Sequence, residues 1–251
     1  MIDLKGKTAI VTGGARDIGG QISRRLAAQG AAVCFNYFDA PEKAEETLND
    51  IIKNGGKAVN LYGDLTRQED IDALVKKSID TFGKRIDILV NVVGGLVARK
   101  QLSEMDEKFW DFVMSLNAKT VFLVTKTVVP YMTEGGSIVN FSSQAARDGG
   151  GPGASAYSSA KGAVLTFTKS MAKELGPKKI RVNAVSPGMI ATTFHDTFTK
   201  PEVREKVAAS TPLRREGQAG EVADLVTYLA SDSSSFVTGA SIEINGGTYF
   251  V

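Results

Sequence analysis

Short apolar runs rich in β-branched residues alternate with longer helical patterns along the whole of this 251-residue chain. The apolar runs lie at 7–12, 31–37, 57–62, 86–93, 137–141, 180–185 and 241–244. The run at 86–93 is almost unbroken, as expected of a strand that is buried on both faces. Helical patterns lie between the runs, at 17–30, 41–54, 67–82, 106–132, 155–175 and 221–231. This alternation predicts an α/β fold with one seven-stranded parallel sheet and helices on both of its faces.

The chain shows no linker, internal repeat or shift of composition that would divide it into domains. We therefore predict a single doubly wound domain of the Rossmann type over residues 1–251. Ligands of such folds bind beyond the carboxyl ends of the strands. The segment 189–215 is polar and irregular, with a short helix expected after Pro201, and we predict that it forms a lid over the substrate.

The composition excludes several classes of function. With 30 basic and 28 acidic residues, the formal net charge is +2, which gives no reason to expect nucleic acid or a membrane as partner. A transition-metal site needs several His or Cys ligands, whereas the chain has one of each, His195 and Cys34, so we expect no metal. We find no signal-peptide pattern and no apolar run of about 18 residues, which predicts a cytoplasmic protein.

A glycine-rich turn, Thr12–Gly19, joins the first predicted strand to the first predicted helix. Glycines at such a place let the backbone approach a pyrophosphate, and the start of the helix supplies amide donors. A purely structural turn is the alternative reading. The position after the first strand of an alternating chain favours a dinucleotide site.

The segment 142–161 carries the clearest chemical pattern. Tyr157 and Lys161 are four residues apart, which places them on one face of the predicted helix. A nearby ammonium favours the phenolate form of tyrosine, whose pKa is otherwise about 10. The two side chains can therefore act as a general acid/base pair, with a hydroxyl from Ser142 or Ser143 beside them. A half-buried tyrosine and a solvated lysine would give the same spacing, so the pattern decides nothing by itself.

Together these motifs resemble the classical short-chain dehydrogenase/reductase family, and within it the 3-oxoacyl-(acyl carrier protein) reductases and the sugar and ketouronate reductases. The glycine fingerprint of the family falls on Thr12–Gly19 and its Tyr-x-x-x-Lys pair on Tyr157 and Lys161. Its adenine-contacting Asp falls on Asp64, its active-site Asn on Asn117, and its Pro-Gly on Pro187-Gly188. The motifs occur in the family's order from end to end of the chain.

The resemblance implies hydride transfer between a nicotinamide and a ketone or secondary alcohol. Tyr157 would be the general acid/base, and Lys161 would lower its pKa and hold the nicotinamide ribose. Ser143 would bind the carbonyl oxygen, and Asn117 would position a water in a proton relay. We prefer Ser143 to Ser142 because the family's serine is the second of such a pair, and neighbouring residues at a strand end point oppositely.

The resemblance also implies which residues contact the ligands. The cofactor site would comprise Gly13, Arg16, Asp17, Ile18, Gly19, Asn36, Tyr37, Asp64, Leu65, Asn91, Val92, Gly94, Tyr157, Lys161, Pro187, Gly188, Ile190 and Thr192. The substrate site would comprise Ser143, Gln144, Arg147, Tyr157 and His195, with Phe194 and Phe198 also able to close on the substrate.

The sequence departs from the family pattern at two places that matter here. Asp17 replaces the second glycine of the fingerprint, and Val92 replaces an Asn that helps to tie the sheet. Asp17 has two readings. As a helix-cap residue it would interact well with the helix dipole; as a carboxylate beside the pyrophosphate it would weaken cofactor binding, and Asp17→Gly would then tighten it.

NADP(H) is the favoured cofactor and NAD(H) the alternative. NAD-preferring relatives usually carry an acidic residue at the end of the second strand, on the ribose 2′-hydroxyl. That position here is Tyr37, and Arg16 in the glycine turn can meet a 2′-phosphate. Asp39 is close enough in sequence to leave NAD(H) open.

The substrate is a small-molecule carbonyl compound of one of two classes. Arg147 can pair with a substrate carboxylate, and Arg99 lies in another loop at the same predicted edge. If either arginine is free, a polar keto-sugar or ketouronate is expected. If both are solvated or bound in salt bridges, a 3-oxoacyl thioester remains.

Two further expectations concern assembly and function class. The helices at 106–132 and 155–175 are apolar or rich in small residues around much of their circumference, and the chain ends in Tyr249-Phe250-Val251, so we expect these surfaces to be covered by a neighbour. In the family that the chain resembles, these two helices pair across a two-fold axis, and the resemblance implies a homotetramer built as a dimer of dimers. A non-catalytic redox sensor that binds a dinucleotide on the same fold is the alternative function. Such a sensor would need the glycines but not Tyr157 and Lys161 together.

Overall fold

A parallel seven-stranded sheet forms the centre of the computed structural model, which describes residues 2–250. Its strands are β1 (Thr8–Thr12), β2 (Ala32–Tyr37), β3 (Lys57–Tyr62), β4 (Ile86–Asn91), β5 (Met132–Phe141), β6 (Arg181–Pro187) and β9 (Ser241–Ile244). They lie in the order β3-β2-β1-β4-β5-β6-β9, so the chain winds outward in both directions from β1 and β4. The predicted doubly wound α/β fold is confirmed.

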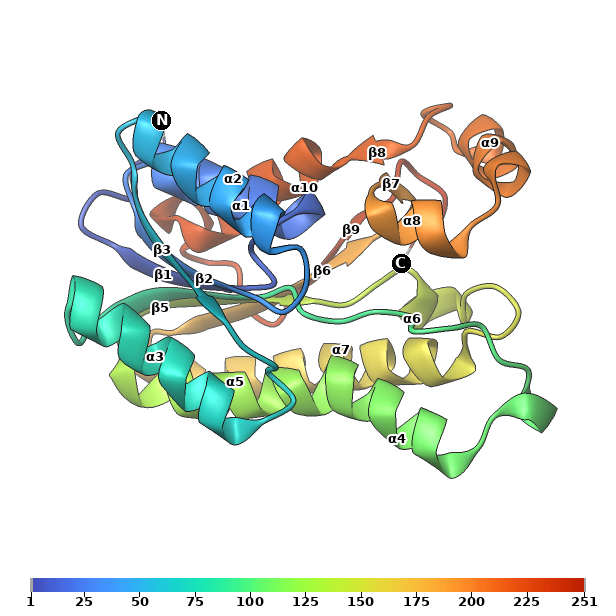
Figure 1. Ribbon diagram of the computed structural model, residues 1–251, viewed down its shortest axis with the longest axis horizontal. Coiled ribbons are helices and arrows are strands. Elements are labelled where there is room, and N and C mark those ends of the chain that lie inside the picture. Colours follow the sequence, from blue (N-terminus) through green and yellow to red (C-terminus); the bar gives the residue numbers. More distant parts are fainter. Residues whose placement is uncertain (1, 251) are drawn as a thin grey trace.

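Helices cover both faces of the sheet (Figure 1). The helices are α1 (Asp17–Ala28), α2 (Pro41–Lys53), α3 (Gln68–Phe82), α4 (Glu107–Met114), α5 (Thr120–Val128), α6 (Ala145–Asp148), α7 (Ser155–Leu175), α8 (Thr193–Phe198), α9 (Pro201–Ser210) and α10 (Ala219–Ala230). Short 3₁₀ turns lie at Leu102–Glu104, Val129–Tyr131, Gly176–Lys178 and Asp232–Ser234. Helices α1, α2 and α10 pack on one face, and α3, α5 and α7 pack on the other.

The strand residues alternate between two hydrophobic cores, one on each face. Val11 and Val33 pack under α1 and α10, whereas Ile10 and Cys34 pack over α3. All four side chains are fully buried, which explains why the sequence of these strands is apolar without alternation. Burial also raises the pKa of the Cys34 thiol to about 12, so this cysteine acts as a small buried apolar residue.

The single helix predicted at 106–132 is interrupted. A π-helical segment, Ser115–Lys119, separates α4 from α5. The side-chain amide of Asn117 donates to Val113 O over 2.9 Å, and Thr120 Oγ1 donates to Ser115 O over 2.9 Å. These side chains satisfy carbonyl groups that a regular helix would pair with backbone amides. Helical periodicity alone does not reveal such a bulge, which is frequent at functional sites.

The same helical run, Glu107–Tyr131, is long and apolar enough to span a membrane by length and composition. Its inner side contains the buried residues Val113, Val121 and Val124, which pack in this domain. Its outer side exposes Trp110, Phe112 and Phe122. The outer side of this helical run is therefore an exposed apolar surface.

The segment predicted as a lid contains more regular structure than expected. It begins with β7 (Ile190–Ala191), which pairs with β8 (Gly217–Gln218) in a separate two-stranded sheet. Between these strands lie α8 and the expected helix after Pro201, α9. Because β7 and β8 pair, the two ends of the segment lie side by side. The segment lies beside the carboxyl end of β6 in Figure 1.

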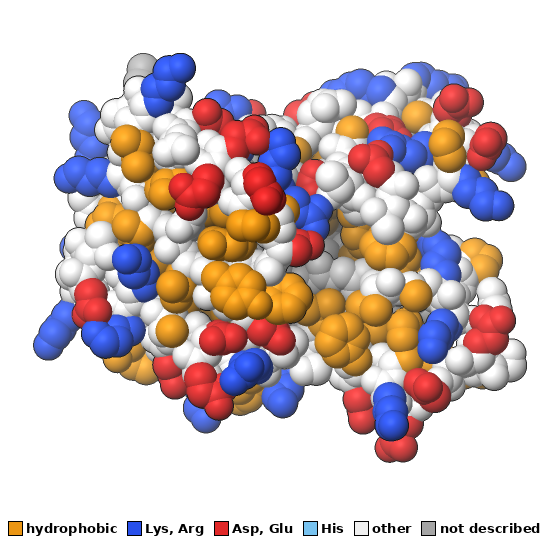
Figure 2. Space-filling view, viewed as in Figure 1, with side chains coloured by type: hydrophobic (Ala, Val, Ile, Leu, Met, Phe, Trp, Pro, Cys, Tyr) orange, Lys and Arg blue, Asp and Glu red, His pale blue; other side chains and the backbone are white. Residues whose placement is uncertain are grey.

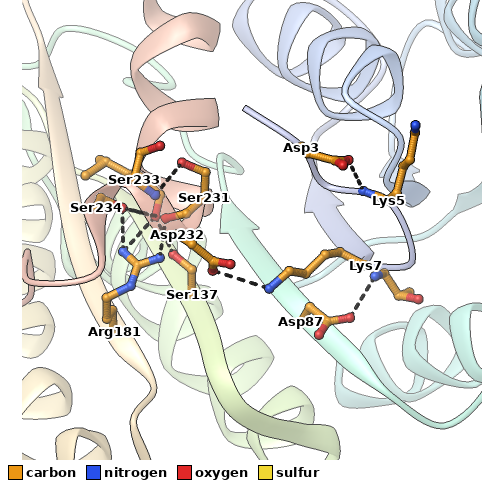
Figure 3. A network of polar contacts seen from close by, with 12 residues as sticks. Asp3, Lys5, Lys7, Asp87, Ser137, Arg181, Ser231, Asp232, Ser233 and Ser234 are labelled. Carbon is orange, nitrogen blue, oxygen red and sulfur yellow. Dashed lines mark hydrogen bonds and ion pairs between the residues drawn. The ribbon is translucent and has the colours of Figure 1, made fainter. Parts of the chain in front are cut away.

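A buried cation anchors the last helix at the opposite edge of the sheet (Figure 3). Arg181 on β6 donates to Leu229 O and Ser234 Oγ from Nη1 and to Ser231 O from Nη2, at 2.7–3.0 Å. These acceptors lie at the C-terminus of α10, where the helix dipole favours a cation. Desolvation by burial lowers the pKa of Arg181, and the nearby charge of Asp232 offsets part of this effect.

Arg181→Met is expected to lower the free energy of unfolding by about 3 kcal/mol, because charged hydrogen bonds are lost and buried carbonyl groups are left without their donor. Urea denaturation followed by circular dichroism measures the change. Lys179→Met is the matched control, since Lys179 pairs with Glu134 on the surface and both side chains are about 70% exposed. An equal loss of stability in the two variants would contradict this assignment.

Candidate active site

The glycine turn after β1 brings backbone amides to the carboxyl edge of the sheet. Gly13 has a φ of +62°, and its N–H donates to Asn36 Oδ1 over 2.8 Å. A Cβ atom at Gly19 would lie 1.9 Å from Gly13 O, so only glycine fits there. The tight turn places the N-terminus of α1 at the surface of this edge, and no side chain caps α1. Uncapped amides at a helix start fit the pyrophosphate of a dinucleotide.

Asn36 differs from its expected role as a cofactor ligand. Its side chain is buried, its Oδ1 accepts from Gly13, and its Nδ2 donates to Gly63 O over 2.9 Å. Both ends of the amide are therefore used to hold the glycine turn against the loop after β3. The Asn36 side chain therefore stabilises the glycine turn from the protein interior and does not line the predicted cofactor site.

The other predicted cofactor residues differ in which atoms they can offer to a ligand. The side chains of Leu65 and Ile190 are in the hydrophobic cores, so these residues offer only backbone atoms to a ligand. Asp64 accepts from the N–H and hydroxyl of Thr66 through Oδ1. Ile18 is in the first turn of α1 and packs against a hydrophobic core. The remaining residues lie in the loops or strand ends of the same edge, namely Tyr37, Val92, Gly94, Pro187, Gly188 and Thr192.

Asn91 and Thr12 tie the strands at the carboxyl edge. Asn91 Nδ2 donates to Asn140 Oδ1 over 2.9 Å, which joins β4 to β5, while Asn91 Oδ1 is buried without a partner. Thr12 Oγ1 accepts from the N–H groups of Val92 and Val93, which joins β1 to the end of β4. These contacts tie the sheet where the family has the Asn that Val92 replaces.

Asp17 does not cap α1, so the helix-cap interpretation is wrong. The residue has a left-handed backbone, with a φ of +50°, and Arg16 is the N-cap of the helix. Its carboxylate instead accepts from Thr193 in the lid and from Arg16 Nη1. Arg16 Nη2 also donates to Asp39 Oδ2 over 2.9 Å, so this guanidinium lies between two carboxylates.

The end of β5 separates the two neighbouring serines, as alternation predicts. Ser142 is buried, and its hydroxyl donates to Lys161 O over 2.9 Å. Ser143 lies on the other side, where its Oγ accepts from Ala145 N and faces the phenol of Tyr157, whose pKa it lowers. Ser142 is therefore engaged in packing, and Ser143 is the serine that contacts Tyr157.

Helix α7 places Tyr157 and Lys161 on one face, beside the end of β5. Lys161 is 3% exposed, and its Nζ donates to Phe141 O over 2.8 Å. The same Nζ lies 5.8 Å from the centre of the Tyr157 ring. The structure thus brings together a hydroxyl, a phenol and an ammonium from two different elements.

Burial dominates the electrostatics of this group. Burial raises the pKa of Tyr157, and the hydrogen bond from Ser143 lowers it by a smaller amount. Burial also lowers the pKa of Lys161 to about 8. The expectation that Lys161 lowers the pKa of Tyr157 is thus not met here, because loss of water disfavours both charged forms. Near neutral pH the phenol is protonated and Lys161 remains mostly charged.

Asn117 fixes the loop that faces Lys161. Its Oδ1 accepts from Gly95 N and its Nδ2 donates to Gly95 O, each over 2.9 Å. A Cβ atom at Gly94 would lie 2.6 Å from Asn117 Oδ1 and 2.8 Å from Lys161 Nζ. The π-helical segment thus carries Asn117 to the buried group, and Gly94 leaves room around the ammonium.

The lid places Phe194, not His195, against Tyr157. The ring centres of Phe194 and Tyr157 are 6.1 Å apart, and those of Phe194 and Phe198 are 5.2 Å apart. His195 Nδ1 contacts Thr199 Oγ1 instead, at 3.0 Å. Burial lowers the pKa of His195 to about 4, and the charge of Arg204 adds to this effect. The imidazole is therefore neutral at physiological pH and is part of the internal packing of the lid.

Arg147 is not free to bind a substrate carboxylate, so that expectation is corrected. Its Nε lies 3.2 Å from Glu243 Oε1, and both side chains are largely buried in this salt bridge between α6 and β9. Arg99 is also engaged, since it donates to the carbonyl groups of Pro152 and Phe198. Gln144 Nε2 donates to Asp148 Oδ2 over 2.8 Å. The two arginines connect loops at the rim of the site.

The face that carries these groups is hollowed between the body of the domain and the lid (Figure 2). The contact of Thr193 with Asp17 is the feature of this edge that sequence reasoning missed. Its only sequence signal was the unusual Asp17, because the partner is 176 residues away. Within residues 2–250 no group of three or more His, Cys, Asp or Glu side chains is arranged to bind a metal ion.

Known proteins are similar to this chain over almost its whole length. A family model described as enoyl-(acyl carrier protein) reductase matches residues 13–249. A 3-oxoacyl-(acyl-carrier-protein) reductase of Staphylococcus aureus is 36% identical over 245 residues, which cover 97% of this chain and 98% of that protein. The structure of a short-chain dehydrogenase/reductase from Serratia marcescens is 33% identical, has a TM-score of 0.92, and covers 97% of this chain and 98% of its own.

A blue fluorescent protein from a metagenomic library, solved in complex with NADPH, is 32% identical and has a TM-score of 0.92. The match covers 99% of this chain and 100% of that one. These matches extend over both the glycine turn and the Tyr157–Lys161 region. This chain therefore belongs to the short-chain dehydrogenase/reductase family and is an NAD(P)-dependent oxidoreductase.

Proposed function

We propose that the protein is an NADPH-dependent carbonyl reductase in which Tyr157 protonates the developing alkoxide. The observation that carries this proposal is that the end of β5 and helix α7 bring together the half-buried Ser143 and Tyr157 and the fully buried Lys161. Burial raises the pKa of Tyr157 and lowers that of Lys161 to about 8, so near neutral pH the phenol is protonated and the lysine is mostly charged. Such a pair can deliver a proton to a carbonyl oxygen and stabilise the charge that forms there.

Each residue of the site has a separate role in this proposal. The hydroxyl of Ser143 donates to the carbonyl oxygen beside Tyr157, and Lys161 supplies positive charge below the phenol. Asn117 holds the Gly94–Gly95 loop, which keeps space around the ammonium. The glycine turn and the start of α1 would hold the pyrophosphate, and the bound nicotinamide would supply the hydride.

Ser143→Ala is expected to lower kcat for carbonyl reduction by about 100-fold, because a donor to the developing oxyanion is removed. Ser142→Ala is the matched control, since Ser142 donates to Lys161 O within the protein. It should change kcat by less than about threefold and act mainly on stability. Steady-state kinetics of both variants decide the matter, and a larger loss in Ser142→Ala would show that the assignment is reversed.

The cofactor preference is proposed to depend on the position of Arg16 between Asp17 and Asp39. We expect a higher kcat/KM with NADPH than with NADH, because the guanidinium can bind a 2′-phosphate. Asp39→Asn should raise the NADPH-to-NADH ratio of kcat/KM by about tenfold, since it removes a carboxylate that competes for Arg16.

Asp50→Asn is the control for the Asp39 variant. Asp50 pairs with Arg24 through a similar contact, but that pair joins α1 to α2 away from the glycine turn. Its NADPH-to-NADH ratio should match that of the unmodified protein. A strong preference of the unmodified protein for NADH would contradict the proposed cofactor.

A 3-oxoacyl thioester is the substrate class that the site now supports best. A ketouronate would need a free arginine to bind its carboxylate, and both Arg147 and Arg99 are engaged within the protein. Phe194 and Phe198 give the lid an apolar inner side beside Tyr157. The Staphylococcus aureus relative is named for activity on 3-oxoacyl groups.

A substrate screen tests this proposal. NADPH oxidation is followed by absorbance with 3-oxoacyl thioesters of increasing chain length, keto-sugars, ketouronates and simple ketones. The highest kcat/KM is expected with the thioesters. Preferential reduction of a ketouronate would overturn the substrate class but keep the reaction, and inactivity toward every carbonyl would overturn the reductase proposal.

We also propose a cytoplasmic homotetramer. The exposed residues Trp110, Phe112 and Phe122 on α4 and α5 support an apolar contact between copies, and Phe250 is 81% exposed at the end of the described chain. The neighbouring Val251 lies outside the described residues. Analytical ultracentrifugation distinguishes a tetramer from a dimer, and a monomer would contradict the proposal.

A further inference from the structure

The carboxylate of Asp17 joins the glycine turn to the lid helix α8. Its Oδ1 accepts from the N–H of Thr193 over 3.1 Å, and its Oδ2 accepts from the hydroxyl of Thr193 and from Arg16 Nη1. A guanidinium, a backbone amide and a hydroxyl are the donors that proteins use for phosphate groups. An internal anion thus satisfies a phosphate-type donor set at the edge where a dinucleotide phosphate is expected.

The backbone at Asp17 indicates that the side chain, rather than the turn, requires this residue. Its φ of +50° is a conformation that glycine adopts without cost and that Asp adopts only with some strain. The turn alone would therefore favour glycine. The contacts of the carboxylate with Thr193 and Arg16 compensate for this strain, and they link segments that are 176 residues apart.

The lid helix depends on this contact for its start. Thr192 is the N-cap of α8, but its side chain makes no capping hydrogen bond and donates to Ile190 O instead. Asp17 supplies an acceptor for the first amide of the helix, at Thr193. The next residue, Phe194, is the one that lies against Tyr157. The carboxylate at the glycine turn therefore also positions the apolar contact over the proposed catalytic group.

We propose that Asp17 is a positioning residue that holds the lid closed through Thr193 in the cofactor-free protein and competes with a cofactor phosphate for Arg16. This inference rests on the proposed function, because it assigns the neighbouring anion site to the cofactor. Binding of a phosphate beside Arg16 and the start of α1 requires the Asp17 carboxylate to release Thr193. Cofactor affinity and lid position are then linked through one side chain.

Hydrogen exchange of the cofactor-free protein tests the lid contact. Asp17→Gly and Thr193→Val should each accelerate exchange of the α8 amides by about threefold to tenfold, because a cap and its hydrogen bonds are lost. Asp39→Asn is the matched control, since it removes a carboxylate from Arg16 but leaves Thr193 untouched. Its α8 exchange should equal that of the unmodified protein. Equal exchange in Asp17→Gly and the unmodified protein would overturn the proposal.

A double-mutant cycle on NADPH binding tests the competition. Asp17→Gly should lower the dissociation constant about tenfold, and Thr193→Val should lower it about threefold in the unmodified background. Thr193→Val should have no further effect in the Asp17→Gly background, because the contact is already absent. Additive effects would mean that Asp17 acts by repulsion alone, and they would overturn the proposed competition.

The two experiments separate this inference from the proposed function. Melting temperatures of all variants show whether each one folds, and glycine suits the φ of this position, so Asp17→Gly should fold. If the unmodified protein binds neither NADPH nor NADH, the proposed function fails. The exchange rates of α8 then decide by themselves whether Asp17 holds the lid.

Discussion

Replacing Tyr157 with phenylalanine is expected to lower kcat for carbonyl reduction by about 1,000-fold. The substitution removes only the hydroxyl, which is the group that donates the proton to the developing alkoxide. General acid/base catalysis contributes about 100- to 10,000-fold in enzymes, and the half-buried phenol of Tyr157, whose pKa is raised by desolvation, fits this role. Steady-state kinetics with NADPH and the preferred carbonyl substrate measure the loss.

Binding measurements separate a catalytic effect from a structural one. The phenylalanine ring keeps the packing against Phe194, so the melting temperature and the NADPH dissociation constant should change little. Tyr131→Phe is the control, since Tyr131 is partly exposed just before the main part of β5, at the opposite edge of the sheet from Tyr157. A kcat within about fivefold of the unmodified value in Tyr157→Phe would remove Tyr157 from the reaction.

Replacing Lys161 with methionine is expected to abolish most activity and, at neutral pH, to make the protein more stable. The loss of kcat should again be about 1,000-fold, because the buried ammonium beside the phenol is removed. The gain in stability should be about 2 kcal/mol near pH 7. It arises because the native protein holds a buried ammonium whose pKa is lowered to about 8.

The pH dependence follows from the direction of this shift. The pKa of Lys161 is about 8 in the folded protein and 10.5 when unperturbed, so folding disfavours the charged form. The cost is fully present below pH 8 and disappears as the pH rises from 8 toward 10.5. A shift of this size corresponds to about 3 kcal/mol, from which the lost hydrogen bond to Phe141 O subtracts about 1 kcal/mol.

Urea denaturation between pH 6.5 and 10.5 compares Lys161→Met with the unmodified protein. The difference in unfolding free energy should be largest at the acid end and should fall above pH 8. Lys169→Met on the same helix is the control, because Lys169 is exposed and no such trend is expected. The kcat/KM of the unmodified protein for reduction should also decrease above pH 8. A stability difference that does not change with pH would contradict a buried charge at Lys161.

The sequence by itself determined the fold and which side chains lie together at its carboxyl edge. Strands buried on both faces must be apolar throughout, so the run at 86–93 already predicted a parallel sheet. The four-residue spacing of Tyr157 and Lys161 determines that they share a helix face, whatever surrounds them. The alternation at a strand end likewise separated Ser142 from Ser143. These are local rules, and one segment contains all the information that they need.

Only the tertiary structure decided where the long polar side chains bind. Arg147 was an open candidate in the sequence and pairs with Glu243, which is 96 residues away. Asp17 was expected to cap its own helix and instead binds Thr193 in the lid. Likewise, the pKa of Tyr157 was expected to be lowered by Lys161, but desolvation raises it. The partners and the solvent exposure of a side chain arise from packing between distant segments. Charged side chains are affected more strongly than apolar ones, because the free energy of a charge depends on each nearby charge and on the loss of water.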